Sequence, residues 1–468
     1  MQSLGFMILM QANVKPIFFT LAPMKAPKLN LFDLTMIVIG LVIGMGIFRT
    51  ASNAARDSIT PAVYFASWIA GGVIALCGAL TYAEIGSRFP VTGGYYKIFA
   101  ECYHPSIAFA VNCIILVSNA ASLSGVALIG SEYISTVIFD SPPSNFAIAS
   151  IAVGAIVLFY GVNLAGLRLS SKTQNVLMII KIAMIVALIS GLFFPSKFVQ
   201  PSAVAAVTHD FSWMDYIKSF GIALVSVSFT YGGYQQTINF GEEVKNPRKN
   251  MSKGIFAGIS IIIILYLLVQ IVYVKIIGFE QLREPQGIAA VVAERLFGPS
   301  GKLFFTFLLF FAVLAYVNVL LLSNPRVMYA MSVDGILPAA FKKKNVERDV
   351  LTVSLTAFAI ICVVILFFAN TFDKILGFTI FLDSIGMATS AATIFILRKK
   401  TKHLNGTGIY TMPLFPVLPL IFIAAYLFVG ASIAFNDYKL ALTGTGVFAG
   451  FLILYFLTVK SRTAPLTK

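Results

Sequence analysis

Two apolar stretches of the chain combine glycines and hydroxyl groups in a way that could form a binding site inside a membrane. The stretch Ile39-Gly-Leu-Val-Ile-Gly-Met-Gly-Ile-Phe48 holds three glycines, and Ser226-Val-Ser-Phe-Thr-Tyr-Gly-Gly-Tyr-Gln235 holds a glycine pair beside several hydroxyls. Because glycine is a poor helix former, each stretch can interrupt a helix. The freed backbone groups are tolerated at membrane depth only where they line a cavity or bind a ligand. Two interruptions facing each other would suit a zwitterion, whose carboxylate would meet N–H groups and whose ammonium would meet carbonyl groups.

A simpler interpretation of the same glycines is helix packing. Gly40 and Gly44 have the spacing that lets two membrane helices approach closely, and the pair Gly232-Gly233 fits a kink. We favour the binding site because glycine-interrupted segments at equivalent places in two halves of a chain point to a transporter site.

Two ionisable residues lie deep in apolar runs. Lys181 stands in the run from Asn175 to Ala187, and Asp383 stands in the run from Phe381 to Gly386. Charged groups at membrane depth are costly and indicate function by default. The alternative for Lys181 is a tolerated lysine in a wet cavity. Asp383 could be a proton-linked group or could hydrogen-bond a neighbouring helix.

The histidines and cysteines show no metal-ligand spacing, so we predict no metal, no cofactor and no disulfide framework. They are scattered at His104, His209, His403, Cys77, Cys102, Cys113 and Cys362.

The composition indicates that these residues lie in membrane-spanning helices. Of 468 residues, 58% are hydrophobic and 11% are charged, against about 25% charged in soluble domains. The apolar runs are long enough for helices that cross a bilayer. The chain is therefore predicted to be a polytopic all-α membrane protein, which excludes a soluble enzyme. We expect twelve spans, at 33–57, 62–87, 95–134, 145–163, 172–194, 213–240, 252–276, 302–332, 351–369, 374–397, 413–434 and 440–459. The third is longer than a bilayer needs, so we expect it to be strongly tilted or to extend into a cytoplasmic section near Gly93 to His104.

The basic residues indicate the orientation. An even number of spans puts both termini on one side, and most of the 34 Lys and Arg fall on that side. Since basic loops stay in the cytoplasm, we predict a multi-pass protein of the plasma (inner) membrane with both termini cytoplasmic. The net charge of +15 is then a signal of topology, and we expect membrane lipids and no nucleic acid as partners.

Several motifs together resemble the amino acid–polyamine–organocation superfamily, and within it the L-type amino acid transporter-like bacterial permeases. The resemblance covers about residues 30–460. Its motifs stand at Gly44-Met-Gly-Ile-Phe48, Ala83-Glu84, Phe89-Pro90, Gly93-Gly94-Tyr95, Tyr231-Gly-Gly-Tyr234, Glu242-Glu-Val-Lys-Asn-Pro-Arg248, Pro325-Arg326-Val-Met-Tyr-Ala-Met331 and Asp334-Gly335-Ile-Leu-Pro338.

This resemblance implies a LeuT-type fold of five-plus-five inverted repeats, with twelve transmembrane helices of which the first and sixth are discontinuous. The corresponding organisation is a cytoplasmic tail at 1–30, a first repeat at 31–195, a second repeat at 196–400, two further helices at 401–460 and a cytoplasmic tail at 461–468.

The resemblance also implies a substrate site at the two interruptions. Backbone N–H groups of Met45 and Gly46 would bind the substrate carboxylate, and carbonyls of Val42, Phe229 and Gly232 would bind its ammonium group. Phe229 would occupy the place of an aromatic gate. Tyr231 and Tyr234 would be wall residues, with Asn119 or Ser122 contributed by the third span. Met45 departs from the family, which often has Ser there. The implied set is Val42, Ile43, Gly44, Met45, Gly46, Ile47, Phe229, Thr230, Tyr231, Gly232, Gly233 and Tyr234.

Coupling and gating residues follow from the same resemblance. Lys181 would place its ammonium where sodium-coupled relatives bind sodium, near the carbonyls of Gly40 or Leu41 and near Asn318, so transport would be sodium-independent. Asp383 remains a possible proton site. An inner gate is expected from Glu84, Glu242, Glu243 and Arg326, with Asp334 as an alternative partner.

The predicted function is secondary active transport of amino acids by alternating access, as sodium-independent exchange (an antiporter) or as proton-linked uptake. Because the implied walls hold no charge, neutral L-amino acids are favoured. Eukaryotic relatives carry a linking Cys in the loop after the third span. The loop from Thr136 to Asn145 has none, so we expect no disulfide-linked heavy chain. The alternatives are an amino acid sensor without net transport and, less favoured, a membrane-embedded enzyme, since Lys181 and Asp383 do not form an acid–base pair.

Overall fold

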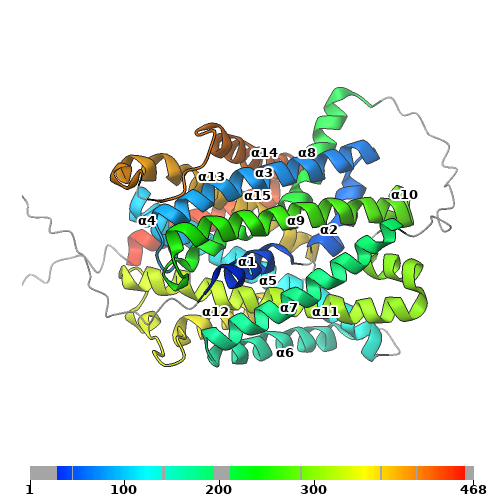
Figure 1. Ribbon diagram of the computed structural model, residues 1–468, viewed down its shortest axis with the longest axis horizontal. Coiled ribbons are helices and arrows are strands. Elements are labelled where there is room, and N and C mark those ends of the chain that lie inside the picture. The colour runs from blue at the N-terminus through cyan, green and yellow to red at the C-terminus, as the bar shows by residue number, and fades with distance from the viewer. Residues whose placement is uncertain are drawn as a thin grey trace, which may run out of the picture.

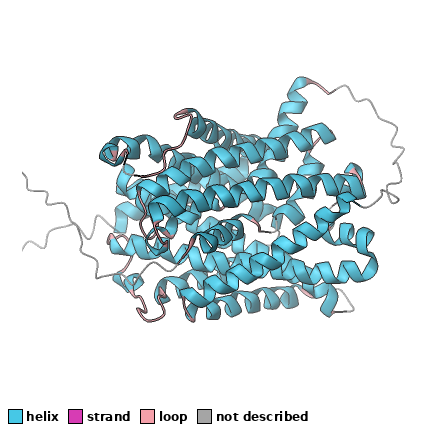
Figure 2. Cartoon of the chain, viewed as in Figure 1, coloured by secondary structure: helices cyan, strands magenta, loops and turns pink. Residues whose placement is uncertain are grey.

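The computed structural model describes residues 29–44, 46–139, 143–193, 211–284, 287–368, 372–406 and 408–458, and these residues form a bundle of helices (Figures 1 and 2). Within those ranges, β pairing is limited to three isolated bridges. The predicted all-helical fold class is therefore confirmed. Nearly all of the predicted N-terminal tail and the whole C-terminal tail lie outside the described residues.

The long helices follow the apolar runs. In the described part of the chain, ten helical segments are long and apolar enough to cross a membrane, and Thr352–Phe367 is a shorter apolar helix. The α-helices are α1 (Leu31–Val42), α2 (Gly46–Asp57), α3 (Pro61–Arg88), α4 (Gly94–Cys102), α5 (Pro105–Ile138), α6 (Asn145–Leu164), α7 (Leu167–Ile189), α8 (Trp213–Tyr231), α9 (Pro247–Ile277), α10 (Phe279–Leu282), α11 (Ile288–Val333), α12 (Thr352–Phe368), α13 (Phe372–Lys400), α14 (Val417–Asn436) and α15 (Tyr438–Thr458).

The outer faces of these helices carry large apolar side chains. Phe146, Phe193 and Phe435 are at least three-quarters exposed, on three different elements. Such faces suit contact with lipid rather than water. The chain is a multi-pass membrane protein.

The predicted third span, 95–134, is divided in the structure, and its first part is the section near Gly93 to His104 that was an alternative to a strongly tilted span. The chain forms α4 up to Cys102 and a separate α5 from Pro105 onward. His104 lies between them with ψ 141°, because a residue before proline is pushed out of the helical region. The side chain of His104 then caps α5 by accepting from the backbone N–H of Ser106.

Two helices end inside the bundle, at the stretches that the sequence singled out. Helix α1 ends at Val42 and α2 begins at Gly46. Helix α8 ends at Tyr231 and is followed by the short 3-10 helix η2 (Tyr234–Asn239). Figure 1 shows α1 and α2 in the middle of the bundle, where α1 packs against α7 and α9, and α2 packs against α8. The fold therefore brings the ends of α1 and α8 into the interior.

Candidate substrate site

The end of α1 has its backbone groups held by neighbouring helices. The N–H of Gly44 donates to the carbonyl of Val42 at 2.8 Å, which closes a tight turn. The hydroxyl of Tyr266, on α9, donates to the same carbonyl at 3.3 Å. The ammonium of Lys181, on α7, donates to the carbonyl of Ile43. The unwound segment is thus fixed from two sides.

The segment after α8 is fixed by contact with the end of α1. Gly233 has a φ of 114°, a conformation that glycine adopts readily, and a Cβ at this position would overlap the carbonyl oxygen of Leu41. The N–H of Gly233 donates to Oε1 of Gln235 at 2.9 Å. Only a residue without a side chain lets the two interruptions approach this closely.

A second close approach joins α2 to α8. A Cβ on Gly46 would lie 2.9 Å from Cα of Thr230. Beside it, the hydroxyls of Thr50 and Thr230 lie 2.5 Å apart, and the Thr230 hydroxyl also donates to the carbonyl of Ser226 at 2.9 Å. Gly46 and Thr230 therefore serve the packing of α2 on α8.

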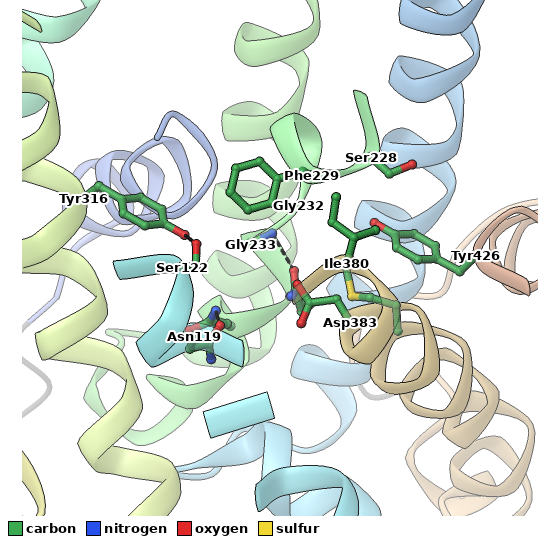
Figure 3. Close-up of a pocket in the computed structure, with 13 residues that line it drawn as sticks. Asn119, Ser122, Ser228, Phe229, Gly232, Gly233, Tyr316, Ile380, Asp383 and Tyr426 are labelled. Atoms are coloured by element: carbon green, nitrogen blue, oxygen red, sulfur yellow. Dashed lines mark hydrogen bonds between the residues drawn. The ribbon is translucent and has the colours of Figure 1, made fainter. Parts of the chain in front are cut away.

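A cavity of about 30 Å³ lies beside the end of α8, with walls from α5, α8, η2, α11, α13 and α14 (Figure 3). Its lining mixes amides, hydroxyls, aromatic rings and one carboxylate. The lining residues are Asn119, Ser122, Ser228, Phe229, Gly232, Gly233, Gln235, Gln236, Tyr316, Ile380, Asp383, Met387 and Tyr426.

The cavity contains part of the predicted substrate set. Phe229, Gly232 and Gly233 line it, as do both Asn119 and Ser122 from α5. Met45 lies outside the described residues. The remaining members of the predicted set are not among the lining residues; they are Val42, Ile43, Gly44, Gly46, Ile47, Thr230, Tyr231 and Tyr234.

The structure places the two predicted wall tyrosines elsewhere. The ring of Tyr231 packs against Trp68 and Tyr266, and the ring of Tyr234 packs against Tyr82. Tyr231 and Tyr234 lie on either side of the break between α8 and η2. The backbone at the break directs both rings away from the cavity, and each ring packs in an aromatic cluster. They serve the packing of α8 and η2 on α3 and α9.

Most polar groups of the lining are hydrogen-bonded to one another. Nε2 of Gln236 donates to Oδ1 of Asn119 at 2.8 Å, and Nδ2 of Asn119 donates to Oδ1 of Asn324 at 2.7 Å. The hydroxyls of Ser122 and Tyr316 lie 2.8 Å apart. These bonds tie α5, η2 and α11 together around the cavity.

Sequence reasoning did not place Gln235, Gln236, Tyr316 or Tyr426 at the site. The pair Gln235-Gln236 directly follows the glycine motif, and amides so near an interruption in an apolar span were a usable signal. Tyr316 and Tyr426 gave no such signal, because aromatic residues are common in membrane helices and do not by themselves indicate a site.

Asp383 changes the expectation about the substrate. Its Oδ1 accepts from the hydroxyl of Ser118, on α5, at 2.7 Å, so it does hydrogen-bond a neighbouring helix. Its side chain also faces the cavity (Figure 3). The prediction of neutral substrates assumes walls without a charge, whereas the lining of this cavity includes a carboxylate.

The environment of Lys181 differs in detail from the prediction. The side chain is 1% exposed, and its ammonium contacts the carbonyl of Ile43 rather than that of Gly40 or Leu41. Asn318 belongs instead to a polar network of α6, α7 and α11. Its amide donates to Oε1 of Gln174 at 2.8 Å, and its Oδ1 accepts from Nδ2 of Asn163 at 2.9 Å.

The predicted gate residues fall into separate contacts at one end of the bundle. Arg326 forms a two-pronged ion pair with Glu243, with a shortest distance of 2.7 Å. Oε2 of Glu242 accepts from the hydroxyl of Thr92 at 2.8 Å, and Asp334 pairs with Lys97. Of the predicted gate residues, Glu243 and Arg326 contact each other, whereas Asp334 has a different partner.

Glu84 holds a second buried cluster at this end. Its carboxylate pairs with Arg88 at 2.6 Å and with Arg398 at 2.7 Å, and it accepts from the backbone N–H of Met412 at 2.7 Å. These bonds join α3 to α13 and to the chain before α14. A buried charge cluster of this kind is costly to disrupt.

Comparison with known proteins gives one consistent family. A sequence profile of amino acid permeases matches residues 29–453. The serine/threonine exchanger of Bacillus subtilis (strain 168) is 28% identical over 412 residues, covering 87% of this chain and 91% of that protein. The methylthioribose transporter of the same organism is 26% identical, covering 85% of this chain and 86% of that protein. The human cystine/glutamate transporter is 25% identical, covering 91% and 85%.

Proposed function

This chain belongs to the amino acid permease family, whose members are secondary transporters and not enzymes, and we propose that it moves L-amino acids across the plasma membrane by alternating access through the cavity beside α8. The observation that carries the proposal is the polar cavity at Gly232 and Gly233, where α8 ends beside the end of α1. Freed backbone groups at such a place recognise the carboxylate and ammonium that all amino acids share.

The small size of the cavity is compatible with a site that opens and closes during a transport cycle. A volume of about 30 Å³ has room for about two water molecules. An amino acid needs more space, so helices around the cavity must move apart to admit it. We assign this movement to the interrupted segments and to the ion pairs of Arg326 with Glu243 and of Arg398 with Glu84.

Coupling without sodium is supported by Lys181. Its ammonium supplies a positive charge at the carbonyl of Ile43, where α1 unwinds, so that end of α1 already has a cation. We propose sodium-independent exchange or proton-linked uptake. Asp383 is the candidate for a proton-linked group.

The proposed orientation has both termini in the cytoplasm. The ion pairs of Glu84 and Glu243 then close the cytoplasmic end of the path. We propose that the chain works without a disulfide-linked heavy chain, because the loop 136–145 holds no cysteine.

The test is binding followed by transport with the purified protein. Thermal denaturation is measured with each of the twenty amino acids, and each stabilising compound is tested for counterflow in proteoliposomes. We expect at least one amino acid to stabilise the protein and to exchange across the membrane. Replacing sodium by choline on both sides should leave the initial rate unchanged. Stabilisation by no amino acid would contradict the proposal, and stabilisation without counterflow would indicate a sensor.

A further inference from the structure

Asp383 is placed where it can contact the side chain of a substrate. It lies on α13, and Figure 3 shows its carboxylate pointing toward the space beneath Phe229 and Gly233. The backbone groups of the interruption lie on the α8 side of the same cavity. A substrate held by its carboxylate and ammonium at the interruption would extend its side chain away from α8 and toward α13.

The charge of Asp383 is not balanced by the other walls. Among the lining residues of the described chain, it is the one with a formal charge at neutral pH. Its contact with Ser118 is to a neutral hydroxyl. Of the nearby amides, Gln236 donates to Asn119 and Gln235 accepts from the backbone N–H of Gly233. The cavity therefore offers negative charge and no fixed cation.

The buried cations of the surrounding helices are engaged elsewhere. Lys181 donates to Ile43, Arg326 pairs with Glu243, and Arg88 pairs with Glu84. A carboxylate in a low-dielectric site is costly unless a cation or several donors compensate it. A cationic ligand group would supply this compensation each time the substrate binds.

We propose that Asp383 selects the substrate: its carboxylate faces the cavity and pairs with a positively charged group at the end of the substrate's side chain, so the protein prefers basic amino acids to neutral ones of the same shape. This inference rests on the proposed function, because it concerns the specificity of that same cavity. A guanidinium suits the site well, since it can bind a carboxylate with two parallel hydrogen bonds.

The unaltered protein tests the proposal with matched ligands. L-Arginine and L-citrulline have nearly the same shape, and citrulline lacks the charge; L-lysine and L-norleucine form a second pair. Inhibition constants are measured in proteoliposomes against whichever amino acid the protein exchanges. We expect arginine to bind about 30-fold or more tightly than citrulline, the ratio typical of a desolvated charge pair. Equal affinities, or tighter binding of citrulline, would overturn the proposal.

Variants locate the effect. In Asp383→Asn the ratio of arginine to citrulline affinity should fall to about one, while citrulline binding persists and shows that the protein is folded. Asp437→Asn is the matched control, because Asp437 lies between α14 and α15, where it accepts from the N–H of Leu440, outside the cavity lining. It should keep the full ratio. A preserved ratio in Asp383→Asn would overturn the assignment. This holds even if the variant loses a pH dependence of transport, because Asp383 would then be a proton site and not the group that selects the substrate.

The outcomes separate this inference from the proposed function. If amino acids bind and exchange but charge on the side chain makes no difference, the specificity assignment alone is wrong. If no amino acid of either pair, and none of the twenty, binds or exchanges, the proposed function itself is wrong.

Discussion

Lys181 and Asp383 both carry an ionisable group in the interior of an apolar helix, but only one of them faces open space. Lys181 is 1% exposed, and its ammonium meets the carbonyl of Ile43 at the end of α1. Asp383 lines the cavity and meets the hydroxyl of Ser118. The lysine region is closed and holds an unwound segment in place, whereas the aspartate faces the cavity.

The comparison shows that depth in the membrane does not define the role of a charge. A buried ionisable group needs compensation. Where the protein supplies the partner, as the backbone carbonyl of Ile43 does for Lys181, the charge is engaged within the fold. Where the protein supplies only a hydroxyl, as for Asp383, a ligand can complete the site.

The largest expected effect is at Gly233, which joins the two regions. Gly233 lines the cavity of Asp383 and packs against Leu41 at the end of the helix that Lys181 holds. In Gly233→Ala the new Cβ meets the Leu41 oxygen in a backbone conformation that alanine rarely adopts, and we expect a loss of about 2–6 kcal/mol of stability. Thermal denaturation in detergent and amino acid exchange in proteoliposomes would both fall sharply.

Gly278→Ala is a control that separates the cost of backbone strain from the cost of steric overlap by the added Cβ. Gly278 has a φ of 82° and no atom within 4 Å of an added Cβ, so its replacement should cost only the backbone strain, about 1–3 kcal/mol. If Gly233→Ala were as stable as Gly278→Ala, the two regions would not be joined through Gly233.

The next effect concerns the closed region. Lys181→Met removes the donor to the Ile43 carbonyl, and an unsatisfied buried acceptor costs about 1–3 kcal/mol. If this cost raises the barrier of the transport cycle, the transport rate falls by about 5- to 150-fold. The initial rate of exchange measures it.

Lys275→Met is the control for that change. Lys275 also donates to a backbone carbonyl, that of Leu192 at 2.6 Å, but it is partly exposed, so water can replace its ammonium. Its replacement should leave the rate close to that of the unaltered protein. Equal losses in the two variants would show that the buried position of Lys181 has no special role.

The smallest expected effect is a difference in accessibility between the regions. In a background without the four native cysteines, Asp383→Cys should react with a small cationic thiol reagent about tenfold faster than Lys181→Cys, because only the first faces a cavity. A transported amino acid should slow the first reaction and leave the second unchanged. Equal rates, or protection of both positions, would remove the distinction between closed and open regions.

The sequence predicted much of the scaffold of the site. It located the stretches at which α1 and α8 end, the depth of Lys181 and the meeting of Glu243 with Arg326. It did not predict the position of Asp383 in the cavity wall or the packing of Tyr231 into an aromatic cluster. A resemblance transfers positions along the chain, whereas the face that a side chain presents depends on how each helix is rotated against its neighbours.

The sequence by itself determined that this chain is a helical membrane protein with interruptions at particular glycines, because apolar length and local backbone preference are properties of consecutive residues. Only the tertiary structure decided which deep charge is enclosed and which is available to a ligand. That outcome depends on residues far apart in the chain, Ile43 opposite Lys181 and Ser118 beside Asp383, which packing alone brings together.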